Sequence, residues 1–297
     1  MHSALFYVNP TPLIFAGLQA KLDETMFVVF GVPFDSTSTY RPGARFAPSA
    51  IRDASINLET WSFRANVDFE DVKAHDLGDV VVAHGNVEET LRRVQEVIAD
   101  IYAAGKIPIM LGGEHTITLG ALKAKRDVAV LVFDAHLDMR DEYLAMKVSH
   151  ATVGRRIVEL VGSIKTLFIG VRAMCREEYD YVNRKGIFYV TSHDIARKGV
   201  REVSRAIKDK LAGFDSIYVS VDVDVLDPAY APGVSNPEPE GLSMSTLLDL
   251  LNEIVDKRVV GVDIVEVTPG YDSGLAAIQA AKIAYETMCL IYRARKA

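Results

Sequence analysis

Cysteine is scarce in this sequence of 297 residues, and the two cysteines, Cys175 and Cys289, lie far apart. Two widely separated cysteines match neither a disulfide framework nor the paired spacing of a thiolate zinc site. We therefore expect both to be reduced residues of the core.

Long apolar runs and an excess of basic residues are also missing. No stretch approaches the roughly 18 consecutive apolar residues of a membrane span, and the N-terminus lacks a basic segment followed by a long apolar one. The formal net charge is −7, which argues against nucleic-acid binding, because such proteins usually carry a basic footprint. We expect no membrane and no nucleic-acid partner, and a cytoplasmic location.

Short apolar runs alternate with amphipathic segments from residue 26 onward. The sequence predicts strands at 26–32, 107–112, 128–134, 166–171, 187–190, 216–222 and 259–265, with a weaker strand near 79–82. Apolar residues at helical spacing predict helices at 87–104, 176–185, 200–211, 244–257 and 273–293. Strands that are apolar on both faces and alternate with helices indicate a parallel sheet covered on both sides. No linker divides the chain, so we expect one three-layer α/β/α domain over residues 1–297, with a mostly parallel sheet of about eight strands.

Residue types that ligate metals gather where three of these apolar runs end. They are His115, then Asp134, His136 and Asp138, then Asp222 and Asp224. Side chains alternate along a strand, so the members of each group are expected to share a face. Buried carboxylates without a cation are unfavourable, and ligands of open α/β sheets bind beyond the carboxyl ends of the strands. The spacing therefore predicts a metal centre at that edge of the sheet.

The residue types in this set also indicate the metal and the chemistry. Carboxylates with two imidazoles and no thiolate suit a hard or borderline ion such as Mn²⁺. Two neighbouring divalent ions can bridge one water and lower its pKa, which makes hydrolysis the expected chemistry. Asp227 leaves two interpretations open: it accepts a hydrogen bond from a ligating imidazole, or it caps the turn before Pro228.

Taken together, these motifs resemble the ureohydrolases, the family of arginase and agmatinase, which hydrolyse guanidino compounds to urea and an amine. The likeness includes Gly31-Val32-Pro33-Phe34-Asp35, the segment from Arg41 to Arg52, and Val265-Glu266-Val267-Thr268-Pro269. It covers nearly the whole chain. It implies an arginase-like fold, two Mn²⁺ ions per subunit, a small cationic guanidino substrate and a homotrimer or homohexamer.

The resemblance also implies a role for each site residue. The ions would be held by His115, Asp134, Asp138 and Asp222, with His136 and Asp224 completing the second coordination sphere. A metal-bridging hydroxide would attack the guanidinium carbon. Asp138 would orient that hydroxide and pass its proton to the leaving amine, His150 would shuttle a proton or contact the substrate, and Glu266 would pair with the guanidinium. A planar cation favours a bidentate carboxylate partner, and a departing amine needs a proton.

Two segments bear on the rest of the substrate. Residues 139–148 resemble the Arg-Asp-Glu-Tyr sequence of agmatinases rather than the polar stretch with which arginases bind an α-carboxylate. After Gly170-Val171-Arg172, no acidic residue follows until Glu177. Both features favour agmatine, which would be hydrolysed to putrescine and urea in polyamine biosynthesis. The alternatives are another amidinohydrolase (guanidinobutyrase, arginase or formimidoylglutamase) or a non-catalytic relative that keeps the fold.

Overall fold

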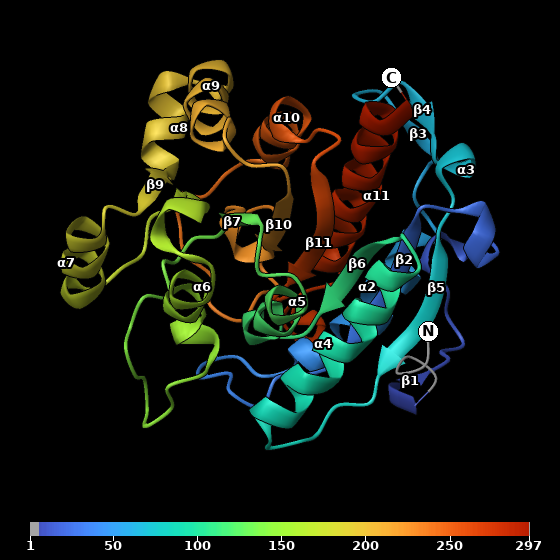
Figure 1. Cartoon of the computed structure of the whole chain (residues 1–297), viewed down its shortest axis with the longest axis horizontal. Coiled ribbons are helices and arrows are strands. Elements are labelled where there is room, and N and C mark those ends of the chain that lie inside the picture. Colours follow the sequence, from blue (N-terminus) through green and yellow to red (C-terminus); the bar gives the residue numbers. More distant parts are fainter. Residues whose placement is uncertain (1–5, 297) are drawn as a thin grey trace.

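The centre of the computed structural model, which describes residues 6–296, is a nine-stranded sheet (Figure 1). Its order is β1-β5-β2-β6-β11-β10-β7-β8-β9. The strands are β1 (Val8–Asn9), β2 (Phe27–Val32), β5 (His75–Val80), β6 (Ile107–Gly112), β7 (Ala129–Phe133), β8 (Thr166–Val171), β9 (Phe188–Thr191), β10 (Ile217–Asp222) and β11 (Val259–Val265). Only β1 pairs antiparallel with its neighbour in this sheet. The predicted α/β fold with a mostly parallel sheet is confirmed.

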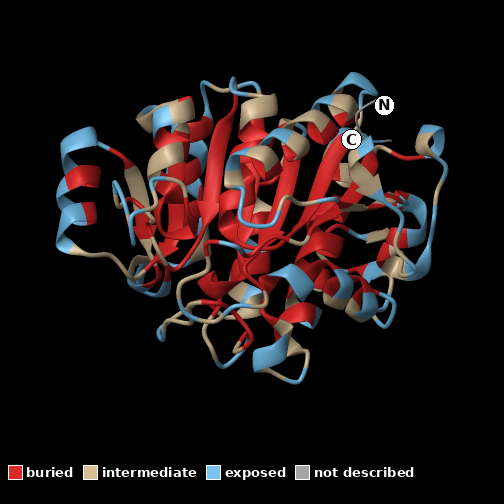
Figure 2. Cartoon of the chain, turned by 90° about the horizontal axis from the view of Figure 1, so that it is seen from below, coloured by how far each residue is buried: buried red, intermediate tan, exposed pale blue. Residues whose placement is uncertain are grey.

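Helices cover both faces of the sheet and complete the three layers. One face carries α2 (Ala47–Ser55), α8 (Ser192–Lys198), α9 (Val200–Leu211), α10 (Met244–Ile254) and α11 (Leu275–Lys296). The other carries α4 (Val87–Ala103), α5 (Thr118–Ala124), α6 (Val153–Val161) and α7 (Arg176–Lys185). Figure 2 shows the sheet as a buried layer between helices whose outward faces are exposed. No helix within residues 6–296 combines the length and apolar character that crossing a membrane requires.

Several elements were not predicted, α6 and α8 among them, and for some of the others the structure shows a physical reason. Helix α5 is short and buried along most of its length, so it has no polar face to give a helical period. Helix α2 buries two polar residues, Arg52 and Ser55, which interrupt its apolar pattern. A two-stranded sheet of β3 (Trp61–Ser62) and β4 (Val67–Asp68), followed by α3 (Phe69–Val72), and strand β1 are too short to leave a pattern.

A buried ion network joins helix α2 to strand β5. Arg52 is fully buried and donates from Nε and Nη2 to both oxygens of Asp76, at 2.8 and 2.9 Å, and from Nη1 to Asp79 at 2.6 Å. Its Nη2 also donates to the carbonyl of Gly78 at 3.0 Å. Asp76 in turn accepts the backbone N–H of Phe15 at 2.9 Å. These bonds explain why β5 carries carboxylates and was only weakly recognisable as a strand.

We predict that Arg52→Leu destabilises the fold by about 3–5 kcal/mol, because it leaves the buried Asp76 carboxylate without its counter-charge. Urea unfolding followed by circular dichroism measures the change. The matched control is Arg176→Leu, which removes the exposed pair with Asp180 on α7 and is expected to change stability by less than about 1 kcal/mol. Equal effects of the two substitutions would contradict the role given to the buried network.

Candidate metal centre and active site

The candidate site lies where four adjacent strands in the middle of the sheet end. β6, β11, β10 and β7 are neighbours in that order, although they are far apart in the sequence. His115 follows β6, Glu266 follows β11, Asp222 ends β10 and Asp134 follows β7. Parallel neighbours about 4.8 Å apart bring their carboxyl ends to one edge. The sheet order thus assembles side chains from four distant segments.

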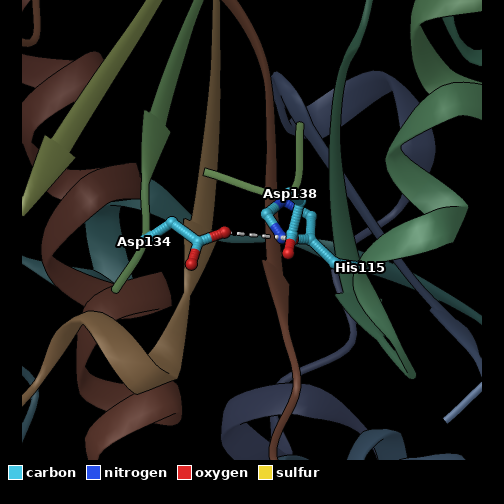
Figure 3. Close-up of side chains that lie close together, drawn as sticks. All are labelled: His115, Asp134 and Asp138. Carbon is cyan, nitrogen blue, oxygen red and sulfur yellow. Dashed lines mark ion pairs between the residues drawn. The ribbon is translucent and has the colours of Figure 1, made fainter. Parts of the chain in front are cut away.

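Three carboxylates surround the Nδ1 atom of His115. This atom lies 3.0 Å from Asp134 Oδ2, 3.3 Å from Asp222 Oδ2 and 3.9 Å from Asp138 Oδ2. Figure 3 shows the Asp134 and Asp138 carboxylates, both from the stretch that follows β7, beside the His115 ring. The ligand atoms of these three side chains lie within 4.8 Å of one another.

A second group shares one member with the first. His136 Nδ1 lies 2.9 Å from Asp224 Oδ2 and 3.5 Å from Asp134 Oδ1, and ligand atoms of the three residues again lie within 4.8 Å of one another. The two oxygens of Asp134 therefore face different imidazoles. All six sequence-predicted metal ligands are brought together, in an arrangement that could hold two ions with Asp134 between them.

The chemistry of the donor set fits divalent cations. His115 Nδ1 is buried and has no hydrogen-bond partner within residues 6–296. Burial, reinforced by the neighbouring Asp134 charge, raises the pKa of Asp138 well above its ordinary value. Burial and the Asp224 charge do the same to the pKa of Asp222. Carboxylates crowded this closely favour binding of a proton or a cation, and oxygen and nitrogen ligands without sulfur suit a hard or borderline metal.

The ligands converge for a reason that strand alternation did not predict. Strand β7 ends at Phe133, one residue short of the predicted 128–134, and Asp224 lies in a 3₁₀ turn, Val223–Val225. Asp138 adopts a left-handed backbone with φ 50°, which is rare for a residue other than glycine. The interpretation that the ligands share one face of a strand is therefore wrong. The backbone geometry of the loops and turns after the strands determines the direction of these side chains instead.

A hydrogen-bond relay behind His115 sets which ring nitrogen faces the carboxylates. The Ser220 hydroxyl donates to Asp263 Oδ1 at 2.6 Å, and Thr118 donates to the other oxygen of Asp263 at 2.9 Å. Because the Ser220 proton is used in this way, Ser220 Oγ is free to accept Nε2–H of His115, 3.0 Å away. In the neutral ring this relay places the proton on Nε2, so that Nδ1 is the nitrogen with a lone pair for a metal ion.

Glu266 has one oxygen bonded and one free. It follows β11 with a left-handed φ of 68° and is 3% exposed. Oε1 accepts the backbone N–H of His115 at 2.6 Å, whereas Oε2 is buried and has no hydrogen-bond partner within the described residues. Burial raises the pKa of Glu266 to about 7, and the hydrogen bond from the backbone N–H of His115 opposes this rise. The free oxygen can accept a hydrogen bond from a cationic ligand.

His150 lies beside Glu266 and not in an exposed loop. It begins the 3₁₀ turn His150–Thr152 and is 7% exposed. Its Nδ1 is 4.0 Å from Glu266 Oε1, and its Nε2 is 2.9 Å from the hydroxyl oxygen of Thr39. Burial lowers the pKa of His150, which favours the neutral ring.

Two further residues take positions that the sequence left open or misjudged. The oxygens of Asp227 accept the backbone N–H groups of Ala229 at 2.9 Å and Gly241 at 3.0 Å. Its carboxylate therefore caps a turn, the second of the two interpretations. Cys289 is buried, but Cys175 is only partly buried and lines the cavity of the site, so the prediction that it is a core residue is wrong.

Four of the six candidate metal ligands, His136, Asp138, Asp222 and Asp224, line a cavity of about 480 Å³. Its lining includes Asp138, His150 and Glu266 together with three further charged residues, Arg140, Glu178 and Glu238. Arg140 belongs to the segment 139–148 that the sequence linked to the substrate, whereas sequence reasoning missed Glu178 and Glu238. Glu178 is 2% exposed and accepts the backbone N–H groups of Met139 and Cys175, at 2.8 and 2.7 Å. A helix-capping glutamate gives no functional signal in sequence, which is why it was missed.

Comparison with known proteins agrees with this geometry. Residues 25–290 match the model of the Arginase family. The agmatinase of Bacillus anthracis is 35% identical over 282 residues, which cover 93% of this chain and 95% of that protein. The mitochondrial guanidino acid hydrolase of Homo sapiens is 38% identical over 271 residues, covering 88% and 77% respectively.

A solved structure, that of the agmatine ureohydrolase of Thermoplasma volcanium, superposes with a TM-score of 0.89 at 37% identity and covers 99% of each chain. The fold and the site define a hydrolase of C–N bonds in amidines. The chain belongs to the arginase family, the ureohydrolases, as the sequence motifs predicted.

We predict that Ser220→Ala lowers metal affinity roughly 10- to 100-fold, because the ring of His115 loses the acceptor that orients it. Equilibrium dialysis against buffered Mn²⁺ measures the affinity. Ser204→Ala is the matched control, because the Ser204 hydroxyl is likewise buried but has no hydrogen-bond partner in the part of the chain described. Equal metal affinities in the two variants would show that the hydrogen-bond relay does not contribute to metal binding.

Proposed function

We propose that this protein hydrolyses agmatine to putrescine and urea with two Mn²⁺ ions bound at the candidate centre. The observation that carries the proposal is the free, buried oxygen of Glu266, in the same cavity as the Asp138 and Asp222 carboxylates. One cavity thus combines a partner for a planar cation with donors for metals. The family membership supports the same reaction class.

The guanidinium would pair with Glu266. A carboxylate binds a guanidinium through charge-assisted hydrogen bonds, and Oε2 is available to accept one. Oε1 stays bonded to the backbone of His115, which would hold the guanidinium carbon near the metal ligands. The left-handed backbone of Glu266 turns its side chain toward the cavity.

The two ions would be held by His115, His136, Asp134, Asp138, Asp222 and Asp224. When bound, the ions supply a water of lowered pKa and charge stabilisation for attack on the guanidinium carbon. Asp138 would take the proton of that water and pass it to the departing amine, a task suited to a carboxyl whose pKa is raised. His150, beside Glu266, would contact the substrate and assist the same proton transfer.

The charge of the cavity lining supports a cationic tail. The lining includes two further carboxylates, Glu178 and Glu238, and no ion pair to either is found within residues 6–296. Agmatine ends in an ammonium group, which a carboxylate would balance. The relatives named agmatinase and agmatine ureohydrolase act on a substrate of this kind, and putrescine formation would place the protein in polyamine biosynthesis.

One observation favours a second candidate, an ω-guanidino acid such as 4-guanidinobutyrate. Arg140 also lines the cavity. Its guanidinium lies over the Tyr143 ring, 4.8 Å from the centroid, and within residues 6–296 it has no carboxylate partner. A free arginine can receive the carboxylate tail of such an acid, and one relative is named a guanidino acid hydrolase.

The test is urea release by the Mn²⁺-loaded protein with agmatine, L-arginine and 4-guanidinobutyrate side by side. Preference for agmatine supports the proposal. Preference for 4-guanidinobutyrate selects the second candidate, and preference for L-arginine restores the arginase alternative. Absence of urea with all three, in protein shown by elemental analysis to hold two metals per subunit, would contradict the proposal and favour a non-catalytic relative.

We predict that Asp138→Asn lowers kcat at least about 100-fold, because an anionic ligand and a proton acceptor are lost together. It should also weaken metal loading. Steady-state urea release, normalised to metal content, measures the effect. Near-normal turnover in fully loaded Asp138→Asn protein would refute the proton-transfer role.

Glu266→Gln should leave the metals bound and lower kcat/KM, because the guanidinium loses its charged partner. The expected loss of transition-state stabilisation is about 2–5 kcal/mol. Metal analysis and urea kinetics on the same preparation separate the two effects. Loss of metal from Glu266→Gln would mean that Glu266 supports the metal centre rather than the substrate.

The homotrimer or homohexamer and the cytoplasmic location implied by the family resemblance stay predictions. Sedimentation velocity of the purified protein tests the first of these.

A further inference from the structure

The loop Asp35–Thr39, which contains none of the predicted site residues, contacts His150 at two points. The backbone N–H of His150 donates to Thr37 Oγ1 at 3.1 Å. The ring Nε2 of His150 lies 2.9 Å from Thr39 Oγ1. Two threonines two residues apart therefore hold both the backbone and the ring of one histidine.

Thr37 is itself held by a buried carboxylate next to a metal ligand. Glu114 is fully buried and accepts the backbone N–H of Thr37 at 2.7 Å. It also accepts the Thr37 hydroxyl in a short hydrogen bond and the Thr116 hydroxyl at 2.7 Å. Because Thr37 donates its proton to Glu114, its oxygen is free to accept the His150 N–H, which fixes the direction of the whole chain of bonds.

The loop is anchored at its start as well. The Glu114 N–H donates to the carbonyl of Phe34 at 2.8 Å, and a Cβ on Gly113 would lie 2.0 Å from the same carbonyl oxygen. The carboxylate of Asp35 accepts the N–H of Gly43 at 2.9 Å and Nε of Arg45 at 2.6 Å. Backbone this close, with both flanks bonded, leaves the loop little freedom to move.

The contact with Thr39 determines which edge of the His150 ring faces the reaction site. With Nε2 bonded to Thr39, Nδ1 is the nitrogen directed toward Glu266, 4.0 Å from its Oε1. Without the Thr39 hydroxyl the ring has no described hydrogen bond, and it can rotate away from this orientation. Such a rotation is enough to lower the rate of hydrolysis substantially, because proton transfer requires the donor and the acceptor to lie within hydrogen-bonding distance.

We propose that Thr39 is a positioning residue that acts through His150, so that the loop Asp35–Thr39 forms part of the catalytic apparatus. The proposal rests on the proposed function, in which His150 assists the leaving amine. It assigns Thr39 no contact with the metals and no proton of its own to transfer.

The loop supplies its own control. Ser38 lies between the two threonines, and its buried hydroxyl has no hydrogen-bond partner within residues 6–296. Thr39→Val removes a hydroxyl that touches His150, Thr39→Ser restores one, and Ser38→Ala removes a hydroxyl that touches nothing described. The variants thus differ in contact with His150 and not in loop position.

The experiment measures kcat and KM for urea release by these variants with the substrate that the wild type prefers. We expect Thr39→Val to lower kcat roughly 10- to 100-fold, as a misplaced catalytic group does, with KM changed less than about threefold and metal content unchanged. Thr39→Ser and Ser38→Ala should stay close to the wild type. In a His150→Asn background, Thr39→Val should have no further effect, because residues that act through one another are not additive.

Crystal structures of the same variants give a readout that does not depend on activity. In Thr39→Val the His150 ring should be rotated or displaced by more than about 0.5 Å, the tolerance of a working site, and in Ser38→Ala it should stay in place. An unmoved ring, a normal kcat in Thr39→Val, or a full further loss in the His150→Asn background would each overturn the proposal. An inactive wild type would instead contradict the proposed function, and the ring positions would still decide the role of Thr39.

Discussion

The constraint on which the site depends is the crowding of four buried or half-buried aspartates around two imidazoles. Asp134 lies at the centre, with one oxygen toward His115 and the other toward His136. Such a cluster is unfavourable unless protons or cations balance it. The stability of this edge of the sheet and its capacity for chemistry are therefore linked through the same side chains.

The surrounding structure holds that cluster in place through its backbone geometry and through hydrogen bonds made by residues behind the cluster. Asp138 and Glu266 both have left-handed backbones, a conformation that costs about 1–3 kcal/mol for a residue other than glycine and that is found mostly at functional sites. The buried Ser220–Asp263 pair orients His115 from behind. The strands fix where the site residues lie, and the turns at the strand ends fix the direction in which their side chains point.

The N-terminal part of the chain connects to this centre through Glu114. Its carboxylate binds the loop that holds His150, and its neighbour His115 belongs to the candidate metal cluster. Hydrogen bonds thus connect the histidine proposed to assist the leaving amine with the segment that carries the first candidate metal ligand. The cavity lining also includes Glu238 and Arg140, which are of opposite charge and bear on the choice between a cationic and an anionic substrate tail.

The sequence by itself determined the fold class and the membership of the candidate metal cluster. Alternating apolar runs and amphipathic segments specify a covered parallel sheet, and aspartates and histidines at strand ends predict a cation site, because both follow from local pattern and burial. The short or fully buried elements, such as α5, left no such pattern and could not be predicted.

Only the tertiary structure decided which segments meet. The order β6-β11-β10-β7 places Glu266 between the ligands, and no local signal encodes that order. The same holds for Thr39 and Glu178, which are an ordinary loop residue and an ordinary helix cap in sequence. Their positions depend on contacts between residues far apart in the chain, and such contacts form only when the whole sheet and its covering helices have packed.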